Sequence, residues 1–394
     1  NVKYSVDIDG PYSEAALNLE ETKFNYMSFS ADKSYYYVVT ALDDAGNESL
    51  PSNPLLISPG GIDDRAPEIH MTSVPNRIVY GSSVRFEGTV TEACYLDIIV
   101  NGTPIQIDTD GNRLILDAND PFSQEIELSK GDNHISIAAE DFAGNRAQLD
   151  YTIQYKTIGL DDIQGIDIGN PTSKGSLRFD DDYNIFYAEG AGSTGLTKNA
   201  TGGDQGYLVG VKIMGDYSFG GKMHFEYIEG VNINYTTIGI TIRQSTEHDS
   251  LHVTLSNQFG GKPVVRKATR ILDKNGNVTA SGNNPANLPF NDGCYFKMIK
   301  TGNKVVAVVS FDPIPEDLNQ MVMTKTLEDG TVVTNSVIQE YDALGLGFDT
   351  NGNPMENYVG FYFNSVSPTL LIPVTFEDVT IVMADGTVVF DSNA

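Results

Sequence analysis

The sequence contains no tryptophan and only two cysteines, Cys94 and Cys294. Two cysteines so far apart do not have the spacing of zinc ligands, so a cysteine-bound zinc site is excluded. They also fall in regions that we assign below to different domains, so no disulfide framework is expected. Each is expected to be a small buried apolar residue. Without tryptophan, any aromatic platform for a ligand must be built from the 20 tyrosines and 18 phenylalanines.

Positive charge is scarce. Lysine and arginine number 25 against 53 aspartates and glutamates, which gives a formal net charge of -28. Such acidity argues against binding to nucleic acid or to an anionic membrane, because both need a basic surface. It fits a secreted protein with acidic loops that hold Ca²⁺, and equally an acidic surface that serves solubility alone.

Long apolar runs are missing as well. No run approaches the roughly 18 apolar residues of a membrane-spanning helix, so we predict no membrane insertion. No signal peptide is visible, because Asn1 opens directly into strand-like sequence. A targeting segment is therefore expected upstream or already removed. The expected location is extracellular, by secretion, with the cell surface as an alternative.

What the sequence does contain is typical of β structure. Glycine occurs 38 times, and short runs of alternating apolar and polar residues are bounded by turn residues. We predict an all-β protein with two small β-sandwiches, the first incomplete, followed by a β jelly roll. The predicted divisions are residues 1–58 for the first sandwich, 59–66 for a linker, 67–156 for the second sandwich and 160–394 for the jelly roll.

The first region ends in a tyrosine-rich strand and a turn, Tyr35–Ala41 followed by Asp44–Ser49. This run resembles the last strands of a bacterial fibronectin type III domain. Such domains need about 90–100 residues, more than precede the linker. A sandwich without its leading strands exposes an edge and a core face, which is unfavourable. We therefore expect a partner that completes it, either an upstream catalytic domain or segment or another chain.

The second region repeats a turn of the first. Asp141–Asn145 has the same pattern as Asp43–Asn47, and both stand between two late strands. The region is similar to bacterial immunoglobulin-like domains that act as spacers, a fold of short strands at regular spacing.

The third region carries phrases whose order and spacing resemble jelly-roll modules appended to pectate lyases and other bacterial polysaccharide-degrading enzymes. These are Asp167–Pro171 with Gly175-Ser176, Gly215–Phe219, Ile238–Arg243, Tyr358–Phe361 and Phe376–Ile381. The resemblance implies a concanavalin-like jelly roll that contacts glycans. Such modules often carry tryptophan, which this chain lacks. The polar stretch Asp312–Pro354, with a hairpin signal at Leu327–Thr331, has no counterpart in the family pattern.

The resemblance also implies a structural Ca²⁺ held by an acidic residue of the last strand, where Glu377 and Asp378 stand. A second acidic run near the start of the region offers Asp180 and Asp182 as oxygen ligands. The alternative is a solvated acidic turn. Any such ion would stabilise the fold and take no part in catalysis.

Side-chain alternation along strands predicts a polar face, because successive residues point to opposite sides. Arginine clamps a carboxylate or a diol by paired hydrogen bonds, and tyrosine offers a ring and a hydroxyl to a sugar. The predicted carbohydrate-binding residues are Lys222, Thr241, Arg243, His252, Tyr362 and Asn364. Two basic groups together indicate an anionic glycan such as a uronic-acid polymer. The first groups Lys222 and Arg243 with His252 and Lys297, and the second consists of Lys262, Arg266, Lys267 and Arg270. An ordinary solvated sheet face, or binding by loops, is the alternative.

Catalytic motifs are absent. Glycoside hydrolysis needs two carboxylates at one sugar bond, but Glu226 and Glu229 have odd spacing and would point to opposite faces of a strand. No Gly-x-Ser-x-Gly elbow occurs. His248 and His252 have the spacing of a helical zinc site, yet their segment reads as a strand. We therefore expect no catalytic residues.

The leading hypothesis is a non-catalytic carbohydrate-binding and spacer region of a secreted enzyme, a polysaccharide lyase or a glycoside hydrolase. One alternative is lyase activity within the jelly roll, using tyrosine, histidine and arginine. The other is a structural or adhesive cell-surface protein with the sandwiches as a stalk.

Overall fold

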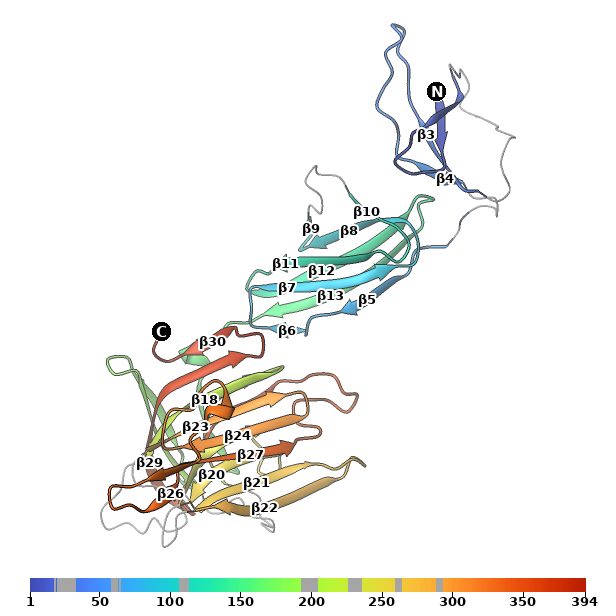
Figure 1. Cartoon of the computed structure of the whole chain (residues 1–394). Helices are drawn as coiled ribbons and strands as arrows, with labels where there is room; N and C mark the ends of the chain where they lie inside the picture. Colours follow the sequence, from blue (N-terminus) through green and yellow to red (C-terminus); the bar gives the residue numbers. More distant parts are fainter. Residues whose placement is uncertain are drawn as a thin grey trace. The chain divides into compact units, whose positions relative to one another are not determined.

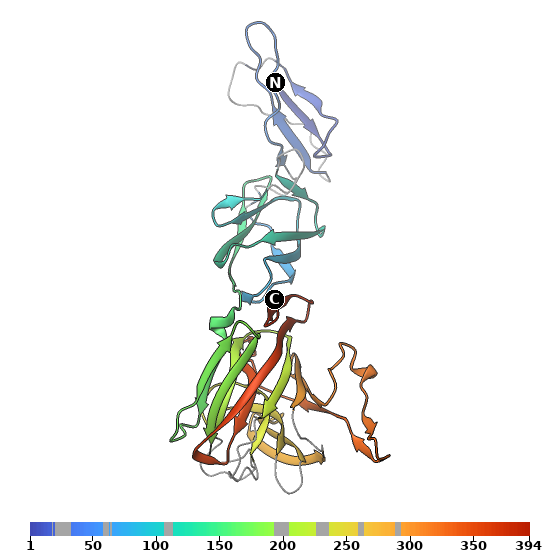
Figure 2. The same cartoon turned by 90° about the vertical axis from the view of Figure 1, so that its left-hand side faces the viewer.

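A computed structural model describes residues 1–17, 19, 33–57, 63, 65–105, 113–192, 205–225, 236–258, 264–287 and 293–394. Among them the regular structure is β-strand apart from two 3₁₀ helices, η1 (Leu160–Asp162) and η2 (Leu318–Gln320), so the predicted all-β class is confirmed. None of the described helices has the length and apolarity to cross a membrane. The chain divides into two compact units, Asn1–Tyr155 and Lys156–Ala394 (Figures 1 and 2).

The first unit opens with a small antiparallel sheet in the order β2-β1-β3-β4. Its strands are β1 (Val2–Ser5), β2 (Ser13–Ala16), β3 (Tyr35–Val39) and β4 (Leu55–Ile57). Val2, Tyr37 and Val38 are buried. The described part of this region therefore forms one sheet rather than a two-layered sandwich.

The same unit continues as a two-sheet sandwich, with the orders β10-β8-β12-β13-β6 and β11-β7-β5, and with β9 added to β8. Alternate residues of its strands point inward, so that Phe86, Ile98 and Ile137 are fully buried in one apolar cluster. Its strands are β5 (Ile69–Ser73), β6 (Ile78–Val79), β7 (Ser83–Val90), β8 (Cys94–Val100), β9 (Thr103–Pro104), β10 (Leu114–Leu116), β11 (Pro121–Glu127), β12 (Gly131–Asp141) and β13 (Arg146–Tyr155).

The turn predicted as a repeat has one geometry at both places. In each copy the Oδ1 atom of the aspartate accepts backbone N–H groups two and four residues later, and the asparagine amide donates to Oδ2, in Asp43–Asn47 and in Asp141–Asn145. Gly46 and Gly144 have φ of 84° and 91°, a conformation that glycine adopts without strain. Two further copies occur at Asp273–Asn277 and Asp349–Asn353.

The second unit is a larger sandwich of two sheets. The seven-stranded sheet has the order β14-β17-β28-β19-β20-β21-β22, and the eight-stranded sheet the order β15-β16-β29-β18-β23-β24-β27, with β30 added to β29. The strands are β14 (Gln164–Ile168), β15 (Ser176–Asp180), β16 (Ile185–Gly192), β17 (Gly206–Ile213), β18 (Tyr217–Phe225), β19 (Thr237–Arg243), β20 (His252–Gln258), β21 (Val264–Leu272), β22 (Val278–Ala286), β23 (Gly293–Thr301), β24 (Lys304–Ser310), β27 (Ser336–Asp342), β28 (Asn357–Asn364), β29 (Ser367–Met383) and β30 (Val388–Asp391).

Aromatic contacts show which faces of the two sheets meet. Phe361 of β28 stacks on Phe376 of β29, with ring centroids 4.7 Å apart, and lies edge-on to Phe219 of β18 at 5.0 Å. These rings form the core between the sheets. The neighbours of Phe361 along its strand, Gly360 and Tyr362, therefore point to the outer face of the seven-stranded sheet.

The predicted insertion 312–354 belongs partly to the fold. Its strand β27 pairs with β24 at the edge of the eight-stranded sheet. The predicted hairpin is present as β25 (Thr324–Thr326) and β26 (Val332–Thr334), and Leu327 donates its N–H to the carbonyl of Thr331 at 2.8 Å.

Candidate functional site

The outer face of the seven-stranded sheet is defined by one register row that crosses six strands. From β14 to β21 the row consists of Ile166, Leu208, Tyr362, Gly239, Ser256 and Arg266. Every second residue of each strand, counted from this row, points to the same face. We call this surface the outer face.

Five of the six predicted carbohydrate-binding residues meet on the outer face. Arg243 lies beside His252, Gly239 beside Tyr362, Thr241 two residues from Gly239, and Asn364 two residues from Tyr362. Alternation thus predicted the direction of these side chains correctly. Whether they bind a sugar remains a prediction.

The alternative of an ordinary solvated sheet face is wrong for these residues. Thr241, Arg243, Tyr362 and Asn364 have no exposed surface, and His252 is 7% exposed. Alternation gives the side of the sheet on which a side chain stands, but it does not tell what covers that side.

Several of these side chains also hold the fold. Arg243 donates from Nε to the carbonyl of Ser245 at 3.3 Å and from Nη2 to that of Glu247 at 2.9 Å, and so fixes the turn after β19. The hydroxyl of Tyr362 donates to the carbonyl of Gln205 at 3.0 Å. Replacing Arg243 or Tyr362 by alanine would therefore disturb the structure as well as any binding.

Other polar groups of the outer face have no partner. The Oγ atom of Ser256 and the Nδ2 atom of Asn364 are buried without a hydrogen bond, as is the Nε atom of Arg270. Ser256 lies opposite Arg266, and Arg270 lies opposite His252. Alternation places Ser256 on this polar face, but it is not among the predicted carbohydrate-binding residues, because a serine in a strand carries no signal of its own.

An apolar patch accompanies these groups. Ile168, Leu208, Ala268 and Tyr362 pack together although they come from four different strands. Gly239 lies in the same row as Tyr362, and a Cβ atom there would come within 2.5 Å of Ser256. The outer face thus combines an aromatic ring and apolar side chains with unpartnered hydrogen-bonding groups, the composition typical of a small-molecule site.

The sixth predicted residue, Lys222, lies elsewhere. It belongs to β18 in the eight-stranded sheet, and its Nζ atom is 2.5 Å from Oε1 of Glu377. Its predicted grouping with Arg243 was therefore wrong. His224 contacts the same oxygen at 2.9 Å, and the pKa of Glu377 is lowered chiefly by the hydrogen bond from Lys222.

The predicted calcium ligands do not converge. Glu377 is engaged by a lysine, whose positive charge opposes a cation on that oxygen. Asp378 accepts from the side-chain amide of Asn393 at 3.1 Å, and Asp180 accepts from the N–H of Asp182 at 3.2 Å. Within the described ranges, these four carboxylates form no group of three whose oxygens lie within 4.8 Å of one another. A calcium ion held by these residues stays a prediction.

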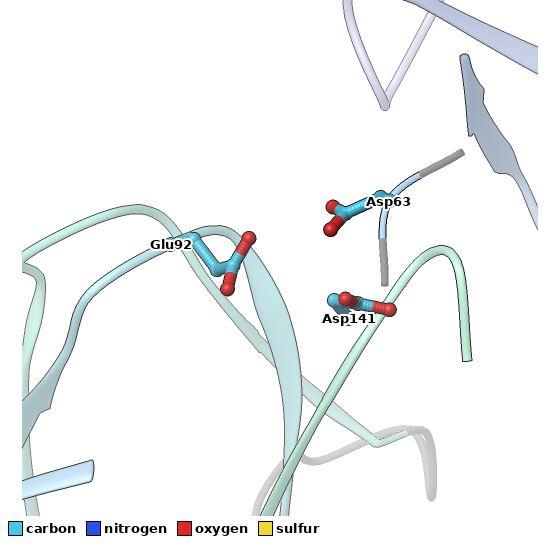
Figure 3. Close-up of side chains that lie close together, drawn as sticks. All are labelled: Asp63, Glu92 and Asp141. Atoms are coloured by element: carbon cyan, nitrogen blue, oxygen red, sulfur yellow. The ribbon is translucent and has the colours of Figure 1, made fainter. Parts of the chain in front are cut away.

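Three carboxylates do meet in the first unit. Asp63, Glu92 and Asp141 have oxygens within 4.8 Å of one another (Figure 3). Asp141 is buried and part of the repeated turn, and Asn145 of that turn also donates to the carbonyl of Asp63 at 3.0 Å. The pKa of Glu92 is raised, first by burial and then by repulsion from Asp63 and Asp141. Such a group either carries unfavourable charge or shares it with a cation.

Of the carboxylates and histidines considered for catalysis, the structure describes only the two histidines. Glu226 and Glu229 lie outside the described residues. His252 is buried, with Nδ1 3.0 Å from the carbonyl of Ser250, whereas His248 is exposed beside Asp249. The two histidines thus have different surroundings and no common ligand role.

Comparison with known proteins gives one family match. Residues 67–157, the second sandwich of the first unit, match the family described as glucodextranase, domain B. No curated protein matches the chain.

Three solved structures are among those to which the chain shows some similarity. The first is a functionally unknown protein from Saccharomyces cerevisiae, 12% identical, with a TM-score of 0.37 over 57% of this chain and 98% of the other. The CBM2 module of the evolved Dit of Lactobacillus casei BL23 phage J-1 is 11% identical, with a TM-score of 0.29 over 53% and 79%. The third structure comes from work on the promiscuous specificity of carbohydrate-binding modules of the β-sandwich superfamily. It is 10% identical, with a TM-score of 0.21 over 81% of this chain and 99% of the other. Likeness at these TM-scores carries no argument about function.

Proposed function

We propose that the chain is a non-catalytic accessory region of a carbohydrate-active protein. In this proposal the outer face of the second unit binds carbohydrate, and the second sandwich of the first unit serves as a spacer. The observation that carries it is a pair of buried, unpartnered polar atoms on the same face of the sheet as Tyr362, namely Ser256 Oγ and Asn364 Nδ2. The match of residues 67–157 to a domain of glucodextranase supports the accessory role.

The physical reason is the cost of an unmade hydrogen bond. A buried polar group without a partner costs about 1–3 kcal/mol, so native structures keep few of them. A sugar presents hydroxyl groups that both donate and accept, and apolar C–H faces that pack on a tyrosine ring. A bound saccharide would therefore supply what the outer face lacks.

The proposed ligand is an acidic glycan. The protein carries a net charge of -28, yet none of the residues that β14, β17, β28, β19, β20 and β21 place on the outer face is an aspartate or a glutamate. Lys212, Arg243, Arg266 and Arg270 stand on it instead. On an acidic protein, a face whose described strand residues include no aspartate or glutamate favours an anionic partner.

The proposed setting is a secreted polysaccharide-degrading enzyme, in which an upstream domain performs the chemistry and this region holds it near the polymer. We propose separately that the protein binds a structural Ca²⁺ ion. A melting temperature that rises with added Ca²⁺ would show this binding.

Affinity electrophoresis through gels that contain neutral or acidic polysaccharides tests the proposal. We expect retardation without release of unsaturated sugar ends, which would be followed by their ultraviolet absorbance. Migration unchanged by every polysaccharide would refute carbohydrate binding. New absorbance would show a lyase instead.

A further inference from the structure

Two arginines of the outer face lack any ion pair. Arg266 and Arg270 both belong to β21, and neither has a hydrogen bond or ion pair with any residue of the described part of the chain. Arg113 shows the usual arrangement, since it pairs with both Asp97 and Glu140. Unpaired arginines are unexpected in a protein with 53 acidic residues.

Neither arginine is simply displayed to solvent. Both are half-buried, and the Nε atom of Arg270 is buried without a partner. Burial lowers the pKa of the Arg266 guanidinium, and no neighbouring charge contributes. The residues opposite them on the neighbouring strands are uncharged apart from a histidine: Ser256, His252 and Ala280. The surrounding strands thus provide no carboxylate to neutralise the two guanidinium groups, although a desolvated charge needs a partner of opposite sign.

Their spacing separates the two positive groups. Four residues along a strand span about 13 Å, and side chains of a strand stand roughly perpendicular to the sheet. Ala268 lies between them on the same face, buried in the apolar patch with Tyr362. One carboxylate would therefore meet one guanidinium, and a single sugar would not reach both.

We propose that Arg266 and Arg270 bind two separate carboxylates of one acidic oligosaccharide, so that the outer face selects a chain of several uronic acid residues. The planar fork of each guanidinium pairs with both oxygens of a carboxylate. This inference rests on the proposed carbohydrate binding and adds the class of the sugar and its minimum length.

Calorimetric titration of the intact chain with galacturonic acid and its di-, tri- and hexasaccharides tests the inference. An ionic strength near 0.15 M shortens the screening length to about 8 Å and so reduces repulsion by the net negative charge. We expect the trisaccharide to bind at least ~10-fold more tightly than the monosaccharide, because only the longer ligand gains the second charged hydrogen-bond pair. Methyl-esterified oligosaccharides of equal length should bind as weakly as the monosaccharide.

Variants assign the effect to the two arginines. Arg266→Gln and Arg270→Gln should each lower the affinity for the acidic trisaccharide ~10-fold and remove its advantage over the methyl ester. Arg266→Lys and Arg270→Lys keep the charge without the fork and should recover part of the affinity. Lys274→Gln, which removes one positive charge at an exposed turn residue after β21, should leave the affinity unchanged. Unchanged melting temperatures would confirm that the variants fold.

The possible failures are distinguishable. Equal binding of acidic and methyl-esterified chains, with no effect of either arginine variant, would overturn this inference and leave carbohydrate binding standing. Tight binding of the monosaccharide that needs both arginines would overturn the two-carboxylate arrangement. Equal or tighter binding of a sulfated oligosaccharide or an oligonucleotide would overturn the uronic acid assignment. No binding of any saccharide would overturn both proposals.

Discussion

The side-chain amide of Asn357 donates a hydrogen bond of 2.7 Å to the hydroxyl of Tyr217, and both residues are buried. Asn357 begins β28 and Tyr217 begins β18, so the bond joins the two sheets of the second unit. Tyr217→Phe should lower the free energy of unfolding of this unit by about 1–3 kcal/mol, because the buried amide of Asn357 loses its acceptor.

Hydrogen exchange of peptides from β18 and β28, measured by mass spectrometry, reports this loss for the second unit alone. Tyr183→Phe is the matched control, since Tyr183 is 72% exposed and should leave exchange unchanged. Equal exchange in the two variants would show that the bond between Asn357 and Tyr217 adds no stability.

Ser256→Ala separates binding from folding. Because the Oγ atom of Ser256 is buried without a partner, its removal should leave the melting temperature unchanged or slightly raised, while the affinity for a bound saccharide falls several-fold. Ser310→Ala is the counterpart on the eight-stranded sheet. Its hydroxyl bonds to that of Ser336 at 2.8 Å, so this change should lower the melting temperature without altering affinity. A loss of stability in Ser256→Ala with unchanged affinity would contradict the proposed site.

Strand periodicity predicted the strands and the direction of their side chains. The apolar residues Ile238, Ile240 and Ile242 alternate with Thr241 and Arg243, and this pattern is enough to assign the two faces of β19. The all-β class follows from many such segments. Burial of the outer face was not predictable, because alternation gives only the side of the sheet on which a residue stands.

The pairing of strands that are distant in the sequence could not be predicted either. The sequence shows Lys222 and Glu377 as isolated charges, so one was assigned to sugar binding and the other to calcium. Their contact joins β18 to β29, and the order of strands in a sheet is a property of the whole fold. For the same reason, the turn at Asp141 was recognised as a repeat while its approach to Glu92 was not.

The contact of Glu377 with Lys222 and His224 should make stability depend on pH. The pKa of Glu377 is lowered from its usual 4.5 in the folded protein, mainly by the hydrogen bond from Lys222. Its stabilisation is therefore present above that usual value and is lost as the pH falls through the lower folded pKa. Glu377→Gln should lower the free energy of unfolding at pH 7 by less than about 1 kcal/mol, since the pair is partly exposed, and the difference should vanish in strong acid.

Thermal unfolding of the second unit at several pH values measures the Glu377 effect. Glu340→Gln removes an exposed carboxylate of β27 that has no ion pair among the described residues, and it serves as the control. A difference between wild type and Glu377→Gln that stays constant with pH would show that titration of Glu377 is not its source.

The carboxylates of Asp63, Glu92 and Asp141 predict the opposite dependence. Because the folded pKa of Glu92 is raised, its neutral form is favoured by folding, and this stabilisation is lost as the pH rises through the folded pKa. In the absence of a cation, Glu92→Gln should therefore raise the melting temperature of the first unit at pH 7. The gain should disappear below pH 4.5, the usual pKa of a glutamate, where the glutamate of the wild type is neutral like the glutamine of the variant. Calorimetry in chelator and then in millimolar Ca²⁺ measures it. If Ca²⁺ stabilises the wild type but not Glu92→Gln, and so reverses their order, the three carboxylates hold the ion; if the order persists in Ca²⁺, their repulsion is simply tolerated by the fold.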